Sequence, residues 1–150
     1  MIAIGSDHGG YKLKEELKKY LKELGIEYKD CGTDTEERTD YPIYAKKVSE
    51  SIQNGEAEEG LLICRSGCGM TMVANKFKGI RAGNVTTIEY AKAAKADDNI
   101  NLLVLSGDYM KTEEAVEIFK AWKNTEFKTK DPRYKARLDM LEEIEKQNMK

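Results

Sequence analysis

The sequence predicts an α/β protein built on a three-layer, doubly wound, five-stranded parallel sheet of the Rossmann-like class. Short apolar runs alternate with longer amphipathic stretches along the whole chain. The apolar runs show little alternation with polar residues, as is typical of strands covered on both faces. The 150 residues contain no repeat, linker or low-complexity tract, so residues 1–150 are expected to form one domain.

Each expected element follows from the period of its apolar residues. Strands are expected at residues 1–5, 26–31, 60–64, 80–85 and 101–105. Helices are expected at residues 13–24, ending at Gly25, and at 41–52, opened by Tyr41-Pro42. Further helices are expected at 70–78, 88–95 and 112–123, with Thr112 as the N-cap of the last. Residues 32–40 form a polar loop, and residues 131–149 form a charged helix. The apolar stripe of that final helix is too narrow for a core element, so it is expected to pack on a partner subunit.

Composition excludes several classes of function. A formal net charge of −2 argues against a nucleic-acid partner. No apolar run approaches the roughly 20 residues of a membrane helix, so no membrane partner is expected. The N-terminus lacks the features of a signal peptide, and the odd count of three cysteines fits reduced thiols, so a cytoplasmic location is expected. His8 is the only histidine, which excludes a zinc site built from histidines.

The segment Cys64-Arg65-Ser66-Gly67-Cys68-Gly69 is the most informative motif. It follows an apolar strand and precedes a helix, so its backbone N–H groups favour an anion. Cys64 falls at the carboxyl end of the strand, where open α/β sheets bind ligands. A strand-end cysteine is more often a small buried hydrophobe. The helix N-terminus and Arg65 favour instead a stabilised thiolate.

A second glycine turn, Gly5-Ser6-Asp7-His8-Gly9-Gly10, ends the first strand. Its spacing is not that of the dinucleotide fingerprint, so NAD binding is disfavoured. Asp7 and His8 are either ligand contacts, or Asp7 only caps the following helix; the motif alone leaves both open.

Two further groups are weaker signals. Arg133 and Arg137 lie four residues apart on one helical face, a spacing that suits a phosphate but is also common on solvated helices. The dipeptide Asp40-Tyr41 offers a carboxylate or a phenol, although a packed Tyr at a Pro-initiated helix is the simpler interpretation.

Taken together and in order, these motifs resemble the ribose-5-phosphate isomerase B family, which includes the galactose-6-phosphate isomerase subunits. The resemblance rests on Gly5–Gly10, Cys31-Gly32-Thr33, Asp40-Tyr41-Pro42, residues 62–70, Ala74-Asn75-Lys76, Gly79-Ile80-Arg81-Ala82 and Arg133 with Arg137. It implies a metal-independent and cofactor-free aldose–ketose isomerase for a sugar phosphate, working through an enediolate. It also implies a dimer with active sites between subunits. A homodimer, a dimer of dimers and pairing with a paralogous subunit remain open.

The resemblance also assigns roles to residues. Cys64 matches the base of one branch, since Met70 occupies the position where another branch has a glutamate base. The expected anion hole is formed by Gly67, Cys68 and Gly69. The expected catalytic groups are Cys64, Ser66 and Asp97, and the expected substrate contacts are Asp7, His8, Tyr41, Arg65, Gly67, Cys68, Gly69, Asp98, Arg133 and Arg137, with no metal ligand.

Three departures from the family pattern bear on the substrate. Asp97 stands where isomerases of this family commonly have a ring-opening histidine, Asp108 replaces a phosphate-holding arginine, and Arg65 replaces a glycine. Ribose 5-phosphate is the first expectation. The alternatives are galactose 6-phosphate, allose 6-phosphate or an open-chain tetrose phosphate, a poorly catalytic subunit or sugar-phosphate sensor, and, more remotely, a dinucleotide or flavin enzyme of similar fold.

Overall fold

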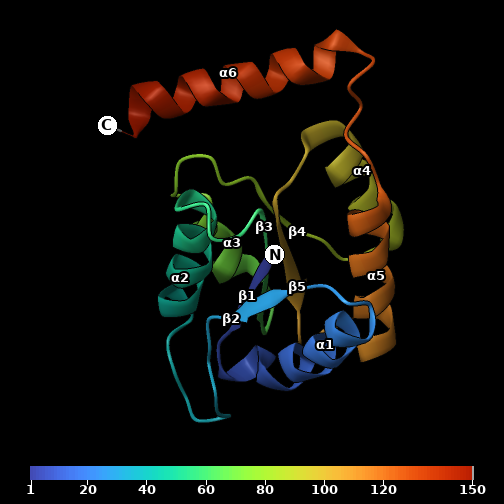
Figure 1. Cartoon of the computed structure of the whole chain (residues 1–150). Helices are drawn as coiled ribbons and strands as arrows, with labels where there is room; N and C mark the ends of the chain where they lie inside the picture. Colours follow the sequence, from blue (N-terminus) through green and yellow to red (C-terminus); the bar gives the residue numbers. More distant parts are fainter. Residues whose placement is uncertain (150) are drawn as a thin grey trace.

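The computed structural model describes residues 1–149 and has the expected five-stranded, all-parallel sheet, in the order β2-β1-β3-β5-β4. Figure 1 labels all five strands. The two outer strands are shorter than expected, because the ladders pair only residues 28–30 of β2 and 82–84 of β4. The strands are β1 (Ile2–Ser6), β2 (Tyr28–Asp30), β3 (Glu59–Cys64), β4 (Ala82–Asn84) and β5 (Leu102–Ser106).

Helices connect the strands and follow β5, and most begin within two residues of the expected positions. They are η1 (His8–Gly10), a 3₁₀ turn, then α1 (Tyr11–Glu23), α2 (Tyr41–Gln53), α3 (Cys68–Ala74), α4 (Ile88–Asp98), α5 (Thr112–Asn124) and α6 (Pro132–Asn148). Helix α3 begins earlier and ends earlier than expected. The N-cap assignment at Thr112 was wrong, because Thr112 is already helical; the N-cap is Lys111, whose backbone N–H donates to the Glu114 carboxylate.

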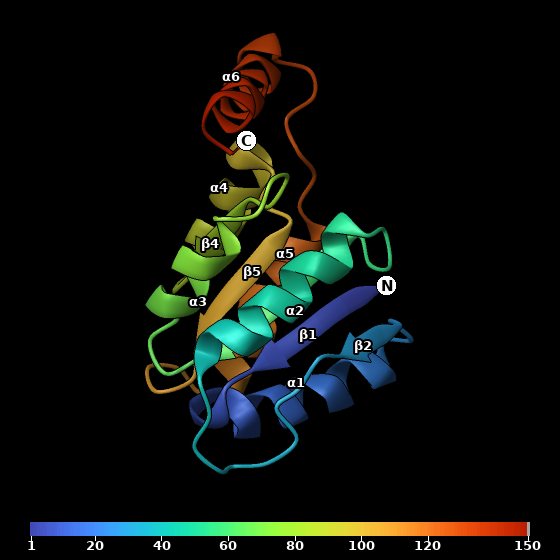
Figure 2. The same cartoon turned by 90° about the vertical axis from the view of Figure 1, so that its left-hand side faces the viewer.

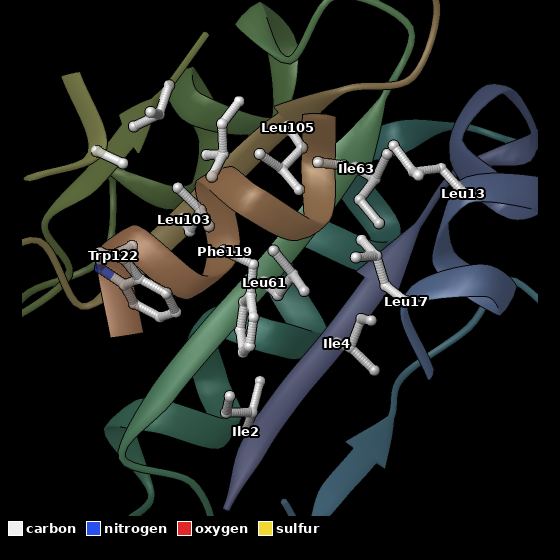
Figure 3. Close-up of a cluster of buried hydrophobic side chains, with 14 of the residues drawn as sticks. Ile2, Ile4, Leu13, Leu17, Leu61, Ile63, Leu103, Leu105, Phe119 and Trp122 are labelled. Atoms are coloured by element: carbon white, nitrogen blue, oxygen red, sulfur yellow. The ribbon is translucent and has the colours of Figure 1, made fainter. Parts of the chain in front are cut away.

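Two hydrophobic layers flank the sheet, because successive strand residues point to opposite faces. On one face, side chains of α1, α4 and α5 cover alternate residues of β1, β3 and β5 (Figure 3). On the other face, α2 and α3 cover the intervening residues, including Leu62, Cys64 and Val104. Phe119 and Trp122 of α5 are buried in the first layer, where the Trp122 indole N–H donates to the Ile100 carbonyl at 3.0 Å.

A buried ion pair ties α1 to the edge strand β2. The Lys14 side chain is fully buried, and its ammonium lies 2.7 Å from the Asp30 carboxylate. Lys18 donates to the same carboxylate at 2.7 Å. Burial alone would raise the pKa of Asp30, but the hydrogen bonds from Lys14 and Lys18 outweigh it and lower that pKa.

The sheet contains a topological switch point at β1 and β3. These strands are neighbours, with Ser6 beside Ile63, yet β1 leads into a helix on one face and β3 into a helix on the other. The two following turns therefore diverge and leave open the crevice in which α/β sheets bind ligands. The turns at residues 7–10 and 64–69 both lie at this edge.

Helix α6 stands apart from the sheet and is joined to α5 by an extended segment (Figures 1 and 2). It lies near the amino ends of β4 and β5, where the Gly79 N–H donates to the Glu145 carboxylate at 3.1 Å. No residue of α6 is buried, and its apolar side chains Met140, Leu141 and Ile144 are exposed. Packing of α6 on a partner subunit stays a prediction.

Candidate active site

Cys64 ends β3 and is the centre of the candidate site. Its side chain is only 4% exposed, but its sulfur faces the backbone of the glycine turn rather than hydrocarbon alone. The Gly67 N–H donates to the Cys64 Sγ at 3.1 Å. Gly67 reaches this orientation with φ +89°, a left-handed conformation that glycine adopts without steric cost. The thiol and the expected anion hole are therefore in direct contact.

The electrostatics of Cys64 differ from the expected stabilised thiolate. Burial raises the pKa of the Cys64 thiol, and hydrogen bonds from the backbone N–H groups of Met70, Gly67 and Ser66 only partly oppose that effect. The Arg65 guanidinium turns to solvent and pairs with Asp108 at 3.3 Å rather than with the thiol. The resting thiol is thus protonated at neutral pH, with amide donors already directed at its sulfur.

The turn after β1 lies against β3. A Cβ placed on Gly10 would come within 2.4 Å of the Ile63 carbonyl oxygen, so glycine permits this close approach. Asp7 is buried and accepts a hydrogen bond from the Gly10 N–H at 3.1 Å, which confirms the helix-cap interpretation of Asp7. The His8 Nδ1 lies 3.2 Å from both the N and the O of Thr39, and so holds the loop 32–40 over this edge.

Helix α2 adds an aromatic wall to the site. The Tyr41 ring lies so close to Gly69 that a Cβ there would come within 2.6 Å of it. Cys68 is exposed at the start of α3, and its N–H donates to the Ser66 Oγ at 3.2 Å. The structure thus gathers at one edge the predicted residues Asp7, His8, Tyr41, Cys64, Arg65, Ser66, Gly67, Cys68 and Gly69.

Sequence reasoning missed two polar residues at this edge. Asn84 and Ser106 are the last residues of β4 and β5, and both donate to the Ser66 carbonyl oxygen, at 3.2 Å and 2.5 Å. Their position at the ends of two predicted strands could have identified them, because polar residues that end parallel strands meet at one edge of the sheet.

The remaining predicted residues lie at the opposite, amino edge of the sheet. Asp97 and Asp98 end α4, and the Asp97 carboxylate is 2.6 Å from the Lys128 ammonium. Arg133 forms an ion pair with Asp131, two residues earlier in the chain, at 2.6 Å. Arg137 stacks on the Tyr134 ring and, with Asp98, lines a cavity of about 530 Å³ under α6. Within one chain, the predicted site residues therefore form two separate groups, one at the carboxyl edge of the sheet and one at the amino edge.

Within residues 1–149, no group of three or more His, Cys, Asp or Glu side chains is arranged to hold a metal ion. Over the same range, no helix combines the length and apolar character needed to cross a bilayer.

Known proteins resemble the chain over 71% to 97% of its length. The model of the ribose/galactose isomerase family matches residues 2–141. Ribose-5-phosphate isomerase B of Escherichia coli is 37% identical over 144 residues, covering 96% of this chain and 95% of that protein. A 4-deoxy-4-sulfo-D-erythrose isomerase of a Clostridium species is 41% identical over 107 residues, 71% of this chain and 67% of that protein.

The solved structure of Clostridium thermocellum ribose-5-phosphate isomerase B superposes with a TM-score of 0.94 at 38% identity, covering 97% of both chains. The chain belongs to the ribose/galactose isomerase family and is an aldose–ketose isomerase.

Proposed function

We propose that this sugar-phosphate isomerase interconverts ribose 5-phosphate and ribulose 5-phosphate, with Cys64 as the base and no metal. The single observation that carries the proposal is the Cys64 sulfur, buried at the switch-point edge and 3.1 Å from the Gly67 amide nitrogen. The name of the Escherichia coli relative supports the five-carbon substrate.

The reaction needs a base and a stabilised oxyanion, because a carbon next to a carbonyl is a weak acid. The Cys64 thiolate takes the proton from C2 of the open-chain aldose, leaving a cis-enediolate. It then returns a proton to C1, while the hydroxyl proton on O2 passes to O1, which gives the ketose. Backbone N–H groups of residues 66–70 stabilise the negative oxygen. The raised pKa of Cys64 makes the thiolate scarce at neutral pH, but a stronger base once formed. The Ser66 hydroxyl, or Asp97, assists in ring opening or in protonating oxygen.

The separation of the two half-sites supports a shared active site. In this proposal a homodimer places the α4–α6 end of one chain, with Asp98, Arg133 and Arg137, over the Cys64 edge of the other. The arginines then hold the substrate phosphate and position the reacting carbons. The exposed apolar residues Leu141 and Ile144 of α6 supply surface for this contact.

Complementation between inactive variants tests the shared site. Cys64→Ala and the double variant Arg133→Ala/Arg137→Ala are each inactive in this arrangement. Mixed one to one with free subunit exchange, half of the dimers are hybrids with one intact site of two, so about one quarter of wild-type activity returns. No recovery, in a mixture whose subunit exchange is verified by mass spectrometry, contradicts a site built from two chains.

An open-chain, four-carbon substrate is the second candidate. The supporting observation is that Lys128 holds Asp97, at 2.6 Å, in an ion pair rather than leaving it free as a ring-opening acid. A tetrose with phosphate or sulfonate at C4 has no hydroxyl there to close a five-membered ring, so it needs no such acid. The sulfo-erythrose isomerase relative acts on a sugar of this kind by its name.

A substrate panel distinguishes the two candidates. Four-, five- and six-carbon aldose phosphates, and the four-carbon sulfonate, are incubated with the protein in D₂O, and loss of the C2 hydrogen signal is followed by NMR. The main proposal predicts the highest kcat/KM for ribose 5-phosphate. Exchange confined to the four-carbon compounds contradicts it and favours the second candidate.

A further inference from the structure

The peptide between Ser66 and Gly67 is held at both ends. Its carbonyl oxygen accepts hydrogen bonds from the Ser106 hydroxyl, at 2.5 Å, and from the Asn84 Nδ2, at 3.2 Å. Its N–H, on Gly67, donates to the Cys64 Sγ. In a planar trans peptide the C=O and N–H point in opposite directions. Whatever fixes the carbonyl therefore also fixes the direction of the N–H.

The strand register brings the two donors to this peptide. Ser106 pairs with Cys64 across β5 and β3, and Asn84 pairs with Val104 on the other side of β5. Ser106 is 2% exposed, so its hydroxyl has little access to water as an alternative partner. Its hydroxyl also lies 3.4 Å from the Asn84 Oδ1, which links the two side chains.

Close packing maintains the arrangement. A Cβ on Gly67 would come within 2.4 Å of the Asn84 Oδ1, so the Asn84 amide lies directly against the Gly67 backbone. Glycine at this position gives the left-handed conformation and at the same time leaves room for Asn84. The carbonyl anchor and the shape of the turn thus depend on each other.

We propose that Asn84 and Ser106 are positioning residues for the isomerase reaction: by anchoring the Ser66 carbonyl, they direct the Gly67 N–H at the Cys64 sulfur and stabilise its thiolate form. This inference rests on the proposed role of Cys64 as the base. Hydrogen bonds to a thiolate favour the charged form, so a misdirected amide leaves less thiolate at a given pH and slows proton removal. Neither side chain needs to touch the substrate.

The test compares Ser106→Ala and Asn84→Leu with a matched control. Ser49 is a fully buried serine of α2 whose hydroxyl has no hydrogen-bond partner within residues 1–149, so Ser49→Ala removes a buried hydroxyl without removing a contact. Each variant is measured in two ways: by the split between kcat and KM, and by the pH dependence of Cys64 alkylation with iodoacetamide, resolved by peptide mass spectrometry. Circular dichroism verifies that each variant is folded.

The expected result is a specific loss of proton-transfer rate. Ser106→Ala and Asn84→Leu each lower kcat about tenfold, with KM within about twofold, and move the alkylation midpoint upward by roughly half a pH unit or more. Ser106→Thr, which retains the hydroxyl, restores both values, and Ser49→Ala changes neither. If Ser106→Ala fails to fold, Asn84→Leu tests the same carbonyl through the other donor.

Two outcomes overturn the proposal: an unchanged alkylation midpoint in folded Ser106→Ala and Asn84→Leu proteins, or an equal change in Ser49→Ala. The alkylation experiment uses no substrate. Its failure is therefore distinct from a failure of the proposed function, which would appear as wild-type turnover in Cys64→Ala.

Discussion

Replacing Gly67 with alanine tests the geometry of the turn most sharply. Gly67 has φ +89°, and a Cβ there would come within 2.4 Å of the Asn84 Oδ1. Gly25, after α1, has φ +70° and nothing within 4 Å of its Cβ position. Gly25→Ala is therefore a matched control, because it imposes the left-handed strain without displacing a neighbour.

The expected magnitudes follow from these contacts. A left-handed conformation costs a non-glycine residue about 1–2 kcal/mol, which both variants lose in free energy of unfolding. Gly67→Ala loses about 1 kcal/mol more, because Asn84 must move and its hydrogen bond to the Ser66 carbonyl is broken. Alanine keeps the backbone N–H, but without the Asn84 anchor this N–H is no longer directed at the Cys64 sulfur. We therefore expect kcat to fall about tenfold in Gly67→Ala, as in Asn84→Leu, and not in Gly25→Ala.

Urea denaturation gives the free energies of unfolding, and initial rates of isomerisation give kcat. The reasoning is refuted if Gly67→Ala is no less stable than Gly25→Ala and retains wild-type kcat. Equal stability losses would show that Asn84 moves away freely. An unchanged kcat would show that the direction of the Gly67 N–H does not matter to the reaction.

Three further predictions follow from the charges and thiols. Asp30→Asn leaves the Lys14 ammonium buried without its partner and lowers the free energy of unfolding by about 3 kcal/mol, the low end for a broken buried pair because Asp30 is partly exposed. The pKa of Asp30 is lowered in the folded protein, so this stabilisation is fully present above the ordinary aspartate pKa. It is lost as the pH falls through the pKa of the folded state. The denaturation curves of wild type and variant therefore converge in acid. Alkylation of Cys64 speeds up as the pH rises, with a midpoint above the ordinary thiol value of about 8.5, because burial raises its pKa; a midpoint below that value contradicts this environment. Asp108→Asn frees the exposed Arg65, changes stability by no more than about 0.5 kcal/mol, and lowers KM for a sugar phosphate a few-fold, whereas a raised KM would show that the carboxylate itself contacts the substrate.

The sequence allowed most of the fold to be predicted, because the periods of its apolar residues are strong. The buried run at residues 60–64 and the stripe of Leu13, Leu17 and Leu21 each fix an element type. The lengths of the edge strands β2 and β4 were overestimated, because apolar residues such as Ile26 and Ile80 lie before the first ladder pair of each strand. Apolar periodicity indicates which residues are buried, but it does not indicate which of them form hydrogen-bonded pairs in the sheet. Residues next to a strand can be buried without being paired.

The site was only partly predictable. Glycines and the strand-end position of Cys64 located the turn, but the protonation state of its thiol depends on desolvation, which only the folded structure defines. The orientation of Arg65 toward Asp108 and the carbonyl anchor formed by Asn84 and Ser106 depend on which strands lie side by side. These contacts join residues that are distant in the sequence, so no local motif predicts them.

The most direct test of the base follows solvent deuterium into the sugar phosphate by NMR, in Cys64→Ala and in Cys31→Ala. Both cysteines are buried and have raised pKa values, so the pair is matched in environment, but Cys31 lies beside Ser51, away from the glycine turn. If Cys64 transfers the proton, Cys64→Ala loses exchange by about 10³-fold while still binding the sugar phosphate, and Cys31→Ala exchanges normally. Wild-type exchange by Cys64→Ala would contradict the mechanism.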